Sequence, residues 1–183
     1  MTRLRRAVRS EAGFTLLELM VVIVLTGIVL TLSAFAVRQF WLRRSLQGAQ
    51  DQVVVQMRQV QQRSMAETYP IVYGVRFQKG SSNWGIVRYN ATSQTCQAVN
   101  NLTMGDGVRF VNDAETDFPD VVTATAACRN ASPSSASYEV LFFYPKGSTN
   151  AATGGSSVKL EQPAIPRTNK VIVSPLTGRV TRA

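Results

Sequence analysis

Two patterns of apolar and polar residues divide the chain. Residues 14–37 are an apolar run in which Glu18 is the one charged side chain. A helix rises about 1.5 Å per residue, so this run would be roughly 36 Å long. The hydrocarbon core of a bilayer is about 30 Å thick. The pattern therefore predicts a membrane-spanning helix over residues 14–37.

The helix is expected to continue over residues 38–69 as an amphipathic second half. No proline lies between Phe14 and Tyr69, and the first proline is Pro70. Apolar residues recur every three or four positions, which is the spacing of one helix face. We expect this stripe to pack on a β-sheet. The stripe consists of Leu46, Ala49, Val53, Met57 and Val60, while Arg43, Arg44, Gln47, Asp51, Arg58 and Gln62 occupy the other faces.

From Pro70 onward the period changes to that of strands. Residues 71–79 and 84–90 are rich in β-branched and aromatic residues around a Gly/Ser/Asn turn, which predicts a β-hairpin. Polar and small residues predict loops over 90–101, 112–137 and 147–155. The expected fold class is α+β, with a long N-terminal helix packed on an antiparallel sheet and a β-rich domain over residues 70–183. Further strands are predicted over 107–111, 138–144, 157–160, 170–174 and 179–182.

Composition argues against an enzyme. Histidine, the commonest general base and a common metal ligand, is absent. No serine lies in a nucleophile-elbow context, and no acids are clustered at catalytic spacing. We expect no catalytic activity, no cofactor and no metal site. The acidic segment with Asp106, Asp113, Glu115, Asp117 and Asp120 does not have the spacing of an EF-hand loop, and we interpret it as a solvated loop rather than a calcium site.

The two cysteines, Cys96 and Cys128, lie in a polar region downstream of an export signal. An even pair in this context predicts one disulfide in an oxidising compartment. The alternative is a pair of unbonded buried thiols.

The carboxylate of Glu18 requires an explanation, because a charge inside an apolar helix is costly and usually meets a partner. The formal net charge is +9, and residues 1–13 contribute Arg3, Arg5, Arg6 and Arg9 as a short basic leader. The segment "GFTLLELMVVIVLTGIVL" resembles the class III signal of type IV prepilins and type II secretion pseudopilins. A bitopic anchor, with Glu18 extended toward the interface, is the alternative.

The resemblance implies a specific processing and assembly route. Residues 1–13 would be a leader that the prepilin peptidase removes by cutting after Gly13, and Phe14 would be methylated. Glu18 would then pair with the free amine of Phe14 of a neighbouring subunit. The implied partners are the prepilin peptidase, other pilin or pseudopilin subunits and the bacterial inner membrane, which the chain would cross once.

The second half of the chain resembles a narrower group. "LFFYPKGST" and "KVIVSPLTGRVTRA" are similar to the paired motifs of the GspH/FimT group. This implies a minor pilin-like subunit of a type IV pilus, or alternatively the H-type minor pseudopilin of a type II secretion system. The C-terminal domain would lie in the periplasm or outside the cell, in a surface pilus or pseudopilus after assembly.

DNA is a further partner that the resemblance implies, because some members of the group take up DNA through a terminal "G-R-x-R" signature. The basic candidates here are Arg167, Lys170, Arg179 and Arg182. The second arginine lies one place late, and alternation along a strand would direct Arg179 and Arg182 to opposite faces. The alternative is that Gly178 makes a hairpin turn and the arginines keep an edge strand soluble.

Aromatic residues alternate along the predicted hairpin, and one interpretation of this row is a surface on which nucleic-acid bases stack. Such rows more often form the core between a sheet and a helix, and we expect a core role. The residues are Tyr69, Tyr73, Phe77, Trp84 and Tyr89.

Overall fold

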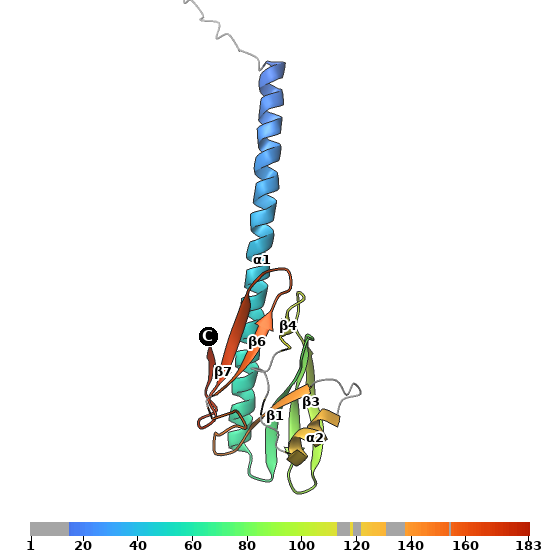
Figure 1. Cartoon of the computed structure of the whole chain (residues 1–183), viewed down its shortest axis with the longest axis vertical. Coiled ribbons are helices and arrows are strands. Elements are labelled where there is room, and N and C mark those ends of the chain that lie inside the picture. The colour runs from blue at the N-terminus through green and yellow to red at the C-terminus, as the bar shows by residue number, and fades with distance from the viewer. Residues whose placement is uncertain (1–14, 113–117, 119–121, 131–137, 154) are drawn as a thin grey trace, which may run out of the picture. The chain divides into compact units, whose positions relative to one another are not determined.

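The computed structural model describes residues 15–112, 118, 122–130, 138–153 and 155–183. These residues form two helices and eight strands (Figure 1). In chain order they are α1 (Leu16–Ala66), β1 (Ile71–Gln78), β2 (Asn83–Asn90), β3 (Thr95–Thr103), β4 (Arg109–Phe110), α2 (Val122–Asn130), β5 (Tyr138–Phe143), β6 (Ser156–Glu161), β7 (Thr168–Val173) and β8 (Val180–Arg182).

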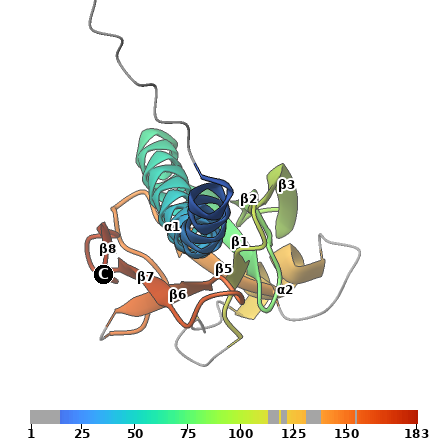
Figure 2. The same cartoon turned by 90° about the horizontal axis from the view of Figure 1, so that it is seen from above.

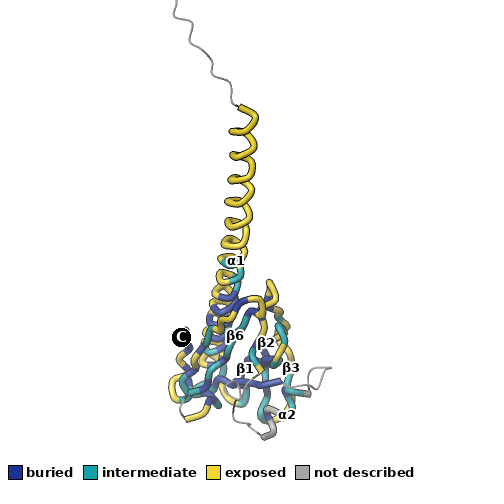
Figure 3. The backbone as a smooth tube through the Cα atoms, turned by 45° about the horizontal axis from the view of Figure 1, so that its top comes forward, coloured by how far each residue is buried: buried dark blue, intermediate teal, exposed yellow. Residues whose placement is uncertain are grey.

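The chain divides into two compact units, Met1–Phe40 and Trp41–Ala183. In the first unit, the described residues are the first half of α1, and its large apolar side chains are exposed. In the second unit, the second half of α1 packs against the strands, and α2 packs on the other face of the first sheet. Figure 3 shows this change in burial along α1.

The amphipathic half of α1 confirms the sequence pattern. All five residues of the predicted stripe are buried, and Val53, Met57 and Val60 are each 0% exposed. The polar residues predicted for the other faces are exposed. The helix ends at Ala66 rather than at the predicted residue 69. Pro70 disfavours helical geometry in the residue before it, so the helix ends a few residues earlier.

The strands form two antiparallel sheets among the described residues. The first has the order β3-β2-β1-β5, and the second has the order β4-β6-β7-β8. The expected α+β class and the helix packed on antiparallel strands are confirmed, although the sequence predicted one sheet. The predicted strands are present with small shifts at their ends, and the strand expected over 107–111 is reduced to Arg109–Phe110.

One hydrophobic core joins α1 to both sheets within the second unit. Its members include Met57 of α1, Phe77 of β1, Leu141 of β5 and Val171 of β7. The view in Figure 2 shows the second half of α1, which belongs to this unit, on one side of the sheets. A smaller cluster lies on the other face of the first sheet, where α2 packs.

Two elements occur where the sequence predicted loops. β3 lies largely in the segment 90–101, and α2 lies in the segment 112–137. β3 is polar and mostly exposed because it is an edge strand with one neighbour, so it lacks an apolar run. α2 is short and rich in Thr and Ala, and its packing on the first sheet rather than its own propensity accounts for it.

Candidate functional site

The start of α1 is set by Thr15 and Glu18. The backbone N–H of Glu18 donates to Oγ1 of Thr15 at 3.2 Å, and the N–H of Leu19 donates to the Thr15 carbonyl at 3.1 Å. Thr15 is therefore the N-cap, and Glu18 is the acid of a Thr-x-x-Glu capping pattern near the positive end of the helix dipole. Gly13 and Phe14, the predicted cleavage and methylation positions, lie outside the described residues.

The apolar half of α1 satisfies its own hydroxyl groups. Thr26 Oγ1 donates to the Val22 carbonyl at 2.6 Å, and Ser33 Oγ donates to the Val29 carbonyl at 2.8 Å. Such bonds remove polar groups from contact with an apolar surrounding. Among the described residues, no cation lies within ion-pair distance of the Glu18 carboxylate. The carboxylate is thus available to a group outside this part of the chain.

This half of α1 is long and apolar enough to cross a membrane, by length and composition. Its large apolar side chains are at least half exposed, from Leu16 at 77% to Val37 at 53%. An apolar surface of this extent requires lipid or other protein around it. The segment is therefore an interaction surface along its whole length.

The four basic residues predicted to contact DNA do not form one patch. Arg167 lies exposed between β6 and β7, and Lys170 lies within β7. The Arg179 carbonyl accepts from the N–H of Ser174, at the other end of β7. Residues 167 and 174 are seven positions apart in the sequence. At the rise of a strand, this corresponds to about 23 Å. A site built from all four residues would have to extend along the sheet.

Arg182 is paired within the protein. Its Nη1 lies 2.6 Å from Oδ1 of Asp51 on α1, and both side chains are more than half exposed. Gly178 adopts φ +60°, and its N–H donates to the Ser174 carbonyl at 2.9 Å in the turn between β7 and β8. The turn at Gly178 and the edge position of β8, which the sequence alternative predicted, are both present in the structure.

A groove lies between the C-terminal strand and α1, and we call it the C-terminal groove. Its volume is about 340 Å³. Arg58 reaches across it, donating from Nη2 to the Val180 carbonyl at 3.1 Å, and Gln61 Nε2 donates to the Thr177 carbonyl at 3.0 Å. The lining combines two arginines with neutral residues, so it favours an anionic ligand. The lining residues are Arg58, Gln61, Gln62, Met65, Thr177, Arg179, Val180 and Thr181.

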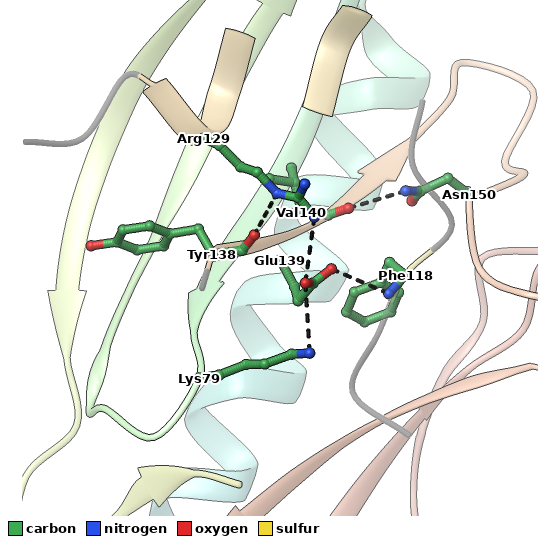
Figure 4. A network of polar contacts seen from close by, with 7 residues as sticks. All are labelled: Lys79, Phe118, Arg129, Tyr138, Glu139, Val140 and Asn150. Atoms are coloured by element: carbon green, nitrogen blue, oxygen red, sulfur yellow. Dashed lines mark hydrogen bonds and ion pairs between the residues drawn. The ribbon is translucent and has the colours of Figure 1, made fainter. Parts of the chain in front are cut away.

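A buried acid on β5 connects the first sheet to α2. Glu139 is 9% exposed, and its carboxylate lies 3.6 Å from Lys79 Nζ and 3.4 Å from Arg129 Nη2 (Figure 4). Arg129 also donates from Nε to the Tyr138 carbonyl at 2.8 Å. A buried charge with two cationic partners is satisfied. The sequence did not indicate this network, because no local pattern relates Arg129 to Glu139 and Lys79 lies far from both along the chain.

The predicted disulfide is present. Cys96 of β3 and Cys128 of α2 are bonded, with Cα atoms 5.1 Å apart. The bond holds α2 to the edge of the first sheet. Of the predicted acidic loop, Asp113, Glu115, Asp117 and Asp120 lie outside the described residues. Asp106 is described, and its carbonyl accepts a hydrogen bond from Gln162 Nε2.

The aromatic residues of the hairpin divide into two groups. Tyr73, Phe77, Trp84 and Tyr89 are buried, which confirms the predicted core role. Tyr69 differs, because 74% of it is exposed. It precedes β1 and lies outside the core.

Comparison with known families identifies the N-terminal segment. Residues 8–34 match the prokaryotic N-terminal methylation motif. Neither curated proteins nor solved structures give a match to the chain. The chain thus carries the class III prepilin signal followed by a long apolar helix, and it fits a type IV pilin-like protein, either pilin or pseudopilin.

Proposed function

We propose that this chain is a minor subunit of a type IV pilus, and that its work is polymerisation rather than catalysis. The observation that carries the proposal is the methylation motif at residues 8–34, joined to the apolar segment over residues 14–37, whose one charged side chain is Glu18. The basic leader would stay on the cytoplasmic side of the inner membrane, and the unit from Trp41 onward would enter the periplasm.

In this proposal Glu18 sets the register of assembly. The prepilin peptidase cuts after Gly13, and the new amine of Phe14 on one subunit pairs with the Glu18 carboxylate of another. In an apolar surrounding the pair is favoured because an unpaired carboxylate there is costly. The exposed apolar face of α1 then packs against neighbouring subunits and supplies the remaining attraction.

The test is expression of the full chain in a bacterium with a working pilus system and prepilin peptidase. We expect mass spectrometry to find a mature chain that begins with methylated Phe14. Gly13→Ala should leave the leader attached. Glu18→Gln, which keeps the size of the side chain, should be cleaved normally yet be lost from sheared filaments.

A Thr26→Val variant is the matched control, since it changes a polar residue of the same helix without removing a charge. It should be cleaved and incorporated like the wild type. Normal incorporation of Glu18→Gln would refute the role of Glu18, and an intact leader on the wild type would refute the whole proposal. Recovery with a secretion pseudopilus instead of surface pili would assign the chain to the type II secretion alternative.

Contact with DNA is a second proposal, and the C-terminal groove supports it. Arg58 and Arg179 line this groove without an acidic neighbour in its lining. Each phosphate that an arginine neutralises adds sequence-independent and salt-sensitive affinity. Arg182 is a weaker candidate than its neighbour, because Asp51 already compensates its charge.

A salt titration of binding to double-stranded DNA, with the full chain in lipid nanodiscs, tests this second proposal. Arg179→Ala should weaken binding and reduce the salt slope by about one unit. Arg63→Ala removes the same charge from an exposed position of α1 outside the groove, and it should have a smaller effect. Equal losses in both variants would indicate attraction by net charge alone.

A further inference from the structure

A second cavity lies on the face of the first sheet that carries α2. Its volume is about 270 Å³. Its wall includes members of the cluster under α2, so it lies opposite the core that contains α1. It is found where β1 begins and where β2 and β5 end. We call it the tyrosine cavity, and it is lined by Tyr69, Val72, Tyr89, Ala91, Gln94, Ala124, Phe142 and Tyr144.

Aromatic rings make up half of this lining. Tyr89 of β2 and Phe142 of β5 come from the same sheet, with their ring centroids 6.1 Å apart and their planes tilted by 57°. Tyr69 stands at the rim with 74% of its surface exposed. A large aromatic side chain that a monomer leaves exposed beside a cavity is available to stack on a ligand.

The tyrosine hydroxyls differ between this cavity and the rest of the protein. Outside it, the Tyr73 hydroxyl donates to Glu67 Oε1 at 2.6 Å, and the Tyr138 hydroxyl donates to Gln78 Oε1 at 3.3 Å. In the cavity, the hydroxyls of Tyr69, Tyr89 and Tyr144 have no partner among the described residues. Three hydroxyls of one lining are therefore free to bind a ligand.

Tyr89 is the most informative of the three. Only 5% of the residue is exposed. Among the described residues, the solvent-inaccessible side-chain nitrogen and oxygen atoms that lack a hydrogen-bond partner are Arg76 Nε and Trp84 Nε1. The Tyr89 hydroxyl also lacks a partner, but it is not one of these inaccessible atoms. The Tyr89 hydroxyl therefore keeps some contact with solvent, and its residue lines the cavity. Burial also raises the pKa of Tyr144, so its hydroxyl, like that of an ordinary tyrosine, is a donor at neutral pH.

The wall of the cavity is held by the surrounding structure. Gln94 adopts φ +52°, a conformation that is uncommon for a side chain other than glycine. Asn90 Oδ1 accepts from the N–H of Thr92 at 2.9 Å and fixes the same turn. The disulfide ties α2, which contributes Ala124, to β3. A preformed wall lowers the entropy that binding must overcome.

We propose that the tyrosine cavity binds one neutral sugar ring of a glycan. The exposed ring of Tyr69 offers an apolar face to the C–H groups of a sugar, and the tyrosine hydroxyls with Gln94 offer hydrogen bonds to its hydroxyls. None of the lining residues is charged, which disfavours an anionic or cationic ligand. The cavity is slightly smaller than most drug-sized sites, which suits a single ring.

An aromatic side chain of a partner protein is the main competitor for this cavity. It would fill the space, but it would leave the hydroxyl of buried Tyr89 without a hydrogen-bond partner. Burying a polar group without a hydrogen-bond partner is unfavourable. A ring that carries hydroxyls avoids this cost, so the unpaired hydroxyls favour the sugar.

The test uses the full chain in phosphatidylcholine nanodiscs, because glycoside detergents would compete for the site. The probes are maltotriose, cellotriose and tri-N-acetylchitotriose, each titrated by calorimetry and by saturation-transfer difference NMR. We expect at least one trisaccharide to bind at millimolar concentrations. NMR should show saturation concentrated on the protons of one ring.

Two variants test the cavity itself. Tyr69→Ala should weaken binding about tenfold through loss of stacking, and Tyr89→Phe about fivefold through loss of one hydrogen bond. Leu176→Ala is the control, because Leu176 is 83% exposed and does not line the cavity. It should bind like the wild type. Circular dichroism checks that each variant is folded.

Failure of all three trisaccharides to bind would overturn the proposal, and so would binding that Tyr69→Ala and Tyr89→Phe leave unchanged. The same titration with toluene, an aromatic ring without a hydroxyl group, separates the competitor. Binding of toluene without any sugar would assign the cavity to an apolar aromatic side chain and reject the glycan. None of these measurements depends on filament assembly, so the result stands apart from the proposed pilus function.

Discussion

Reduction of the disulfide between Cys96 and Cys128 offers a quantitative test of how α2 is held. The two residues are 32 positions apart in the sequence. For a loop of this length, the chain-entropy relation gives a stabilisation of about 3.7 kcal/mol at 25 °C. With a urea m-value of about 2 kcal/mol/M, the unfolding midpoint should fall by about 1.8 M on reduction.

The assay is urea unfolding of the full chain in nanodiscs, with and without reductant, followed by tryptophan fluorescence. Trp84 is 2% exposed in the core of the second unit, whereas Trp41 is 63% exposed, so the signal change reports mainly on Trp84. Hydrogen exchange adds the location of the effect. The amides of α2 should lose more protection on reduction than those of β6 and β7, which the disulfide does not join.

A Cys96→Ala/Cys128→Ala double variant is the control for the reductant. Its midpoint should not change when reductant is added, and it should lie near that of the reduced wild type. A fall of less than about 0.5 M on reduction of the wild type would refute the loop-entropy reasoning. It would mean that the network around Glu139 holds α2 without the covalent bond.

Two further predictions address the core and one titrating group. Met57 is 0% exposed, so Met57→Ala should lower the unfolding free energy by about 2–5 kcal/mol. Val55 is 51% exposed, so Val55→Ala should lower it by less than about 0.5 kcal/mol. Equal losses of the two variants in urea unfolding would contradict the packing of α1. The hydrogen bond to Glu67 raises the pKa of Tyr73, so its contribution to stability is present below about pH 10 and is lost as pH rises through the folded-state pKa. Glu67→Gln should lower the Tyr73 pKa in an alkaline absorbance titration, and an unchanged curve would argue against this bond.

Local sequence patterns predicted much of the fold. The three- and four-residue spacing from Leu46 to Val60 identified the buried face of α1, because a helix has a fixed period and one face must meet the core. Pro70 marked the helix end to within a few residues. The hairpin of β1 and β2 followed from β-branched residues around a Gly/Ser/Asn turn. The motif from Gly13 to Glu18 indicated processing and assembly, since its chemistry lies within a few consecutive residues.

Tertiary structure decided what depends on distant contacts. β3 and α2 have weak local patterns, and they form because β2, the first sheet's outer face and Cys96–Cys128 stabilise them. Only the folded chain shows that Asp51 pairs with Arg182, and that Tyr69, Tyr89 and Tyr144 line one cavity from different elements. Local patterns report the period of an element, whereas such sites depend on which elements become neighbours, and that is settled by packing of the whole core.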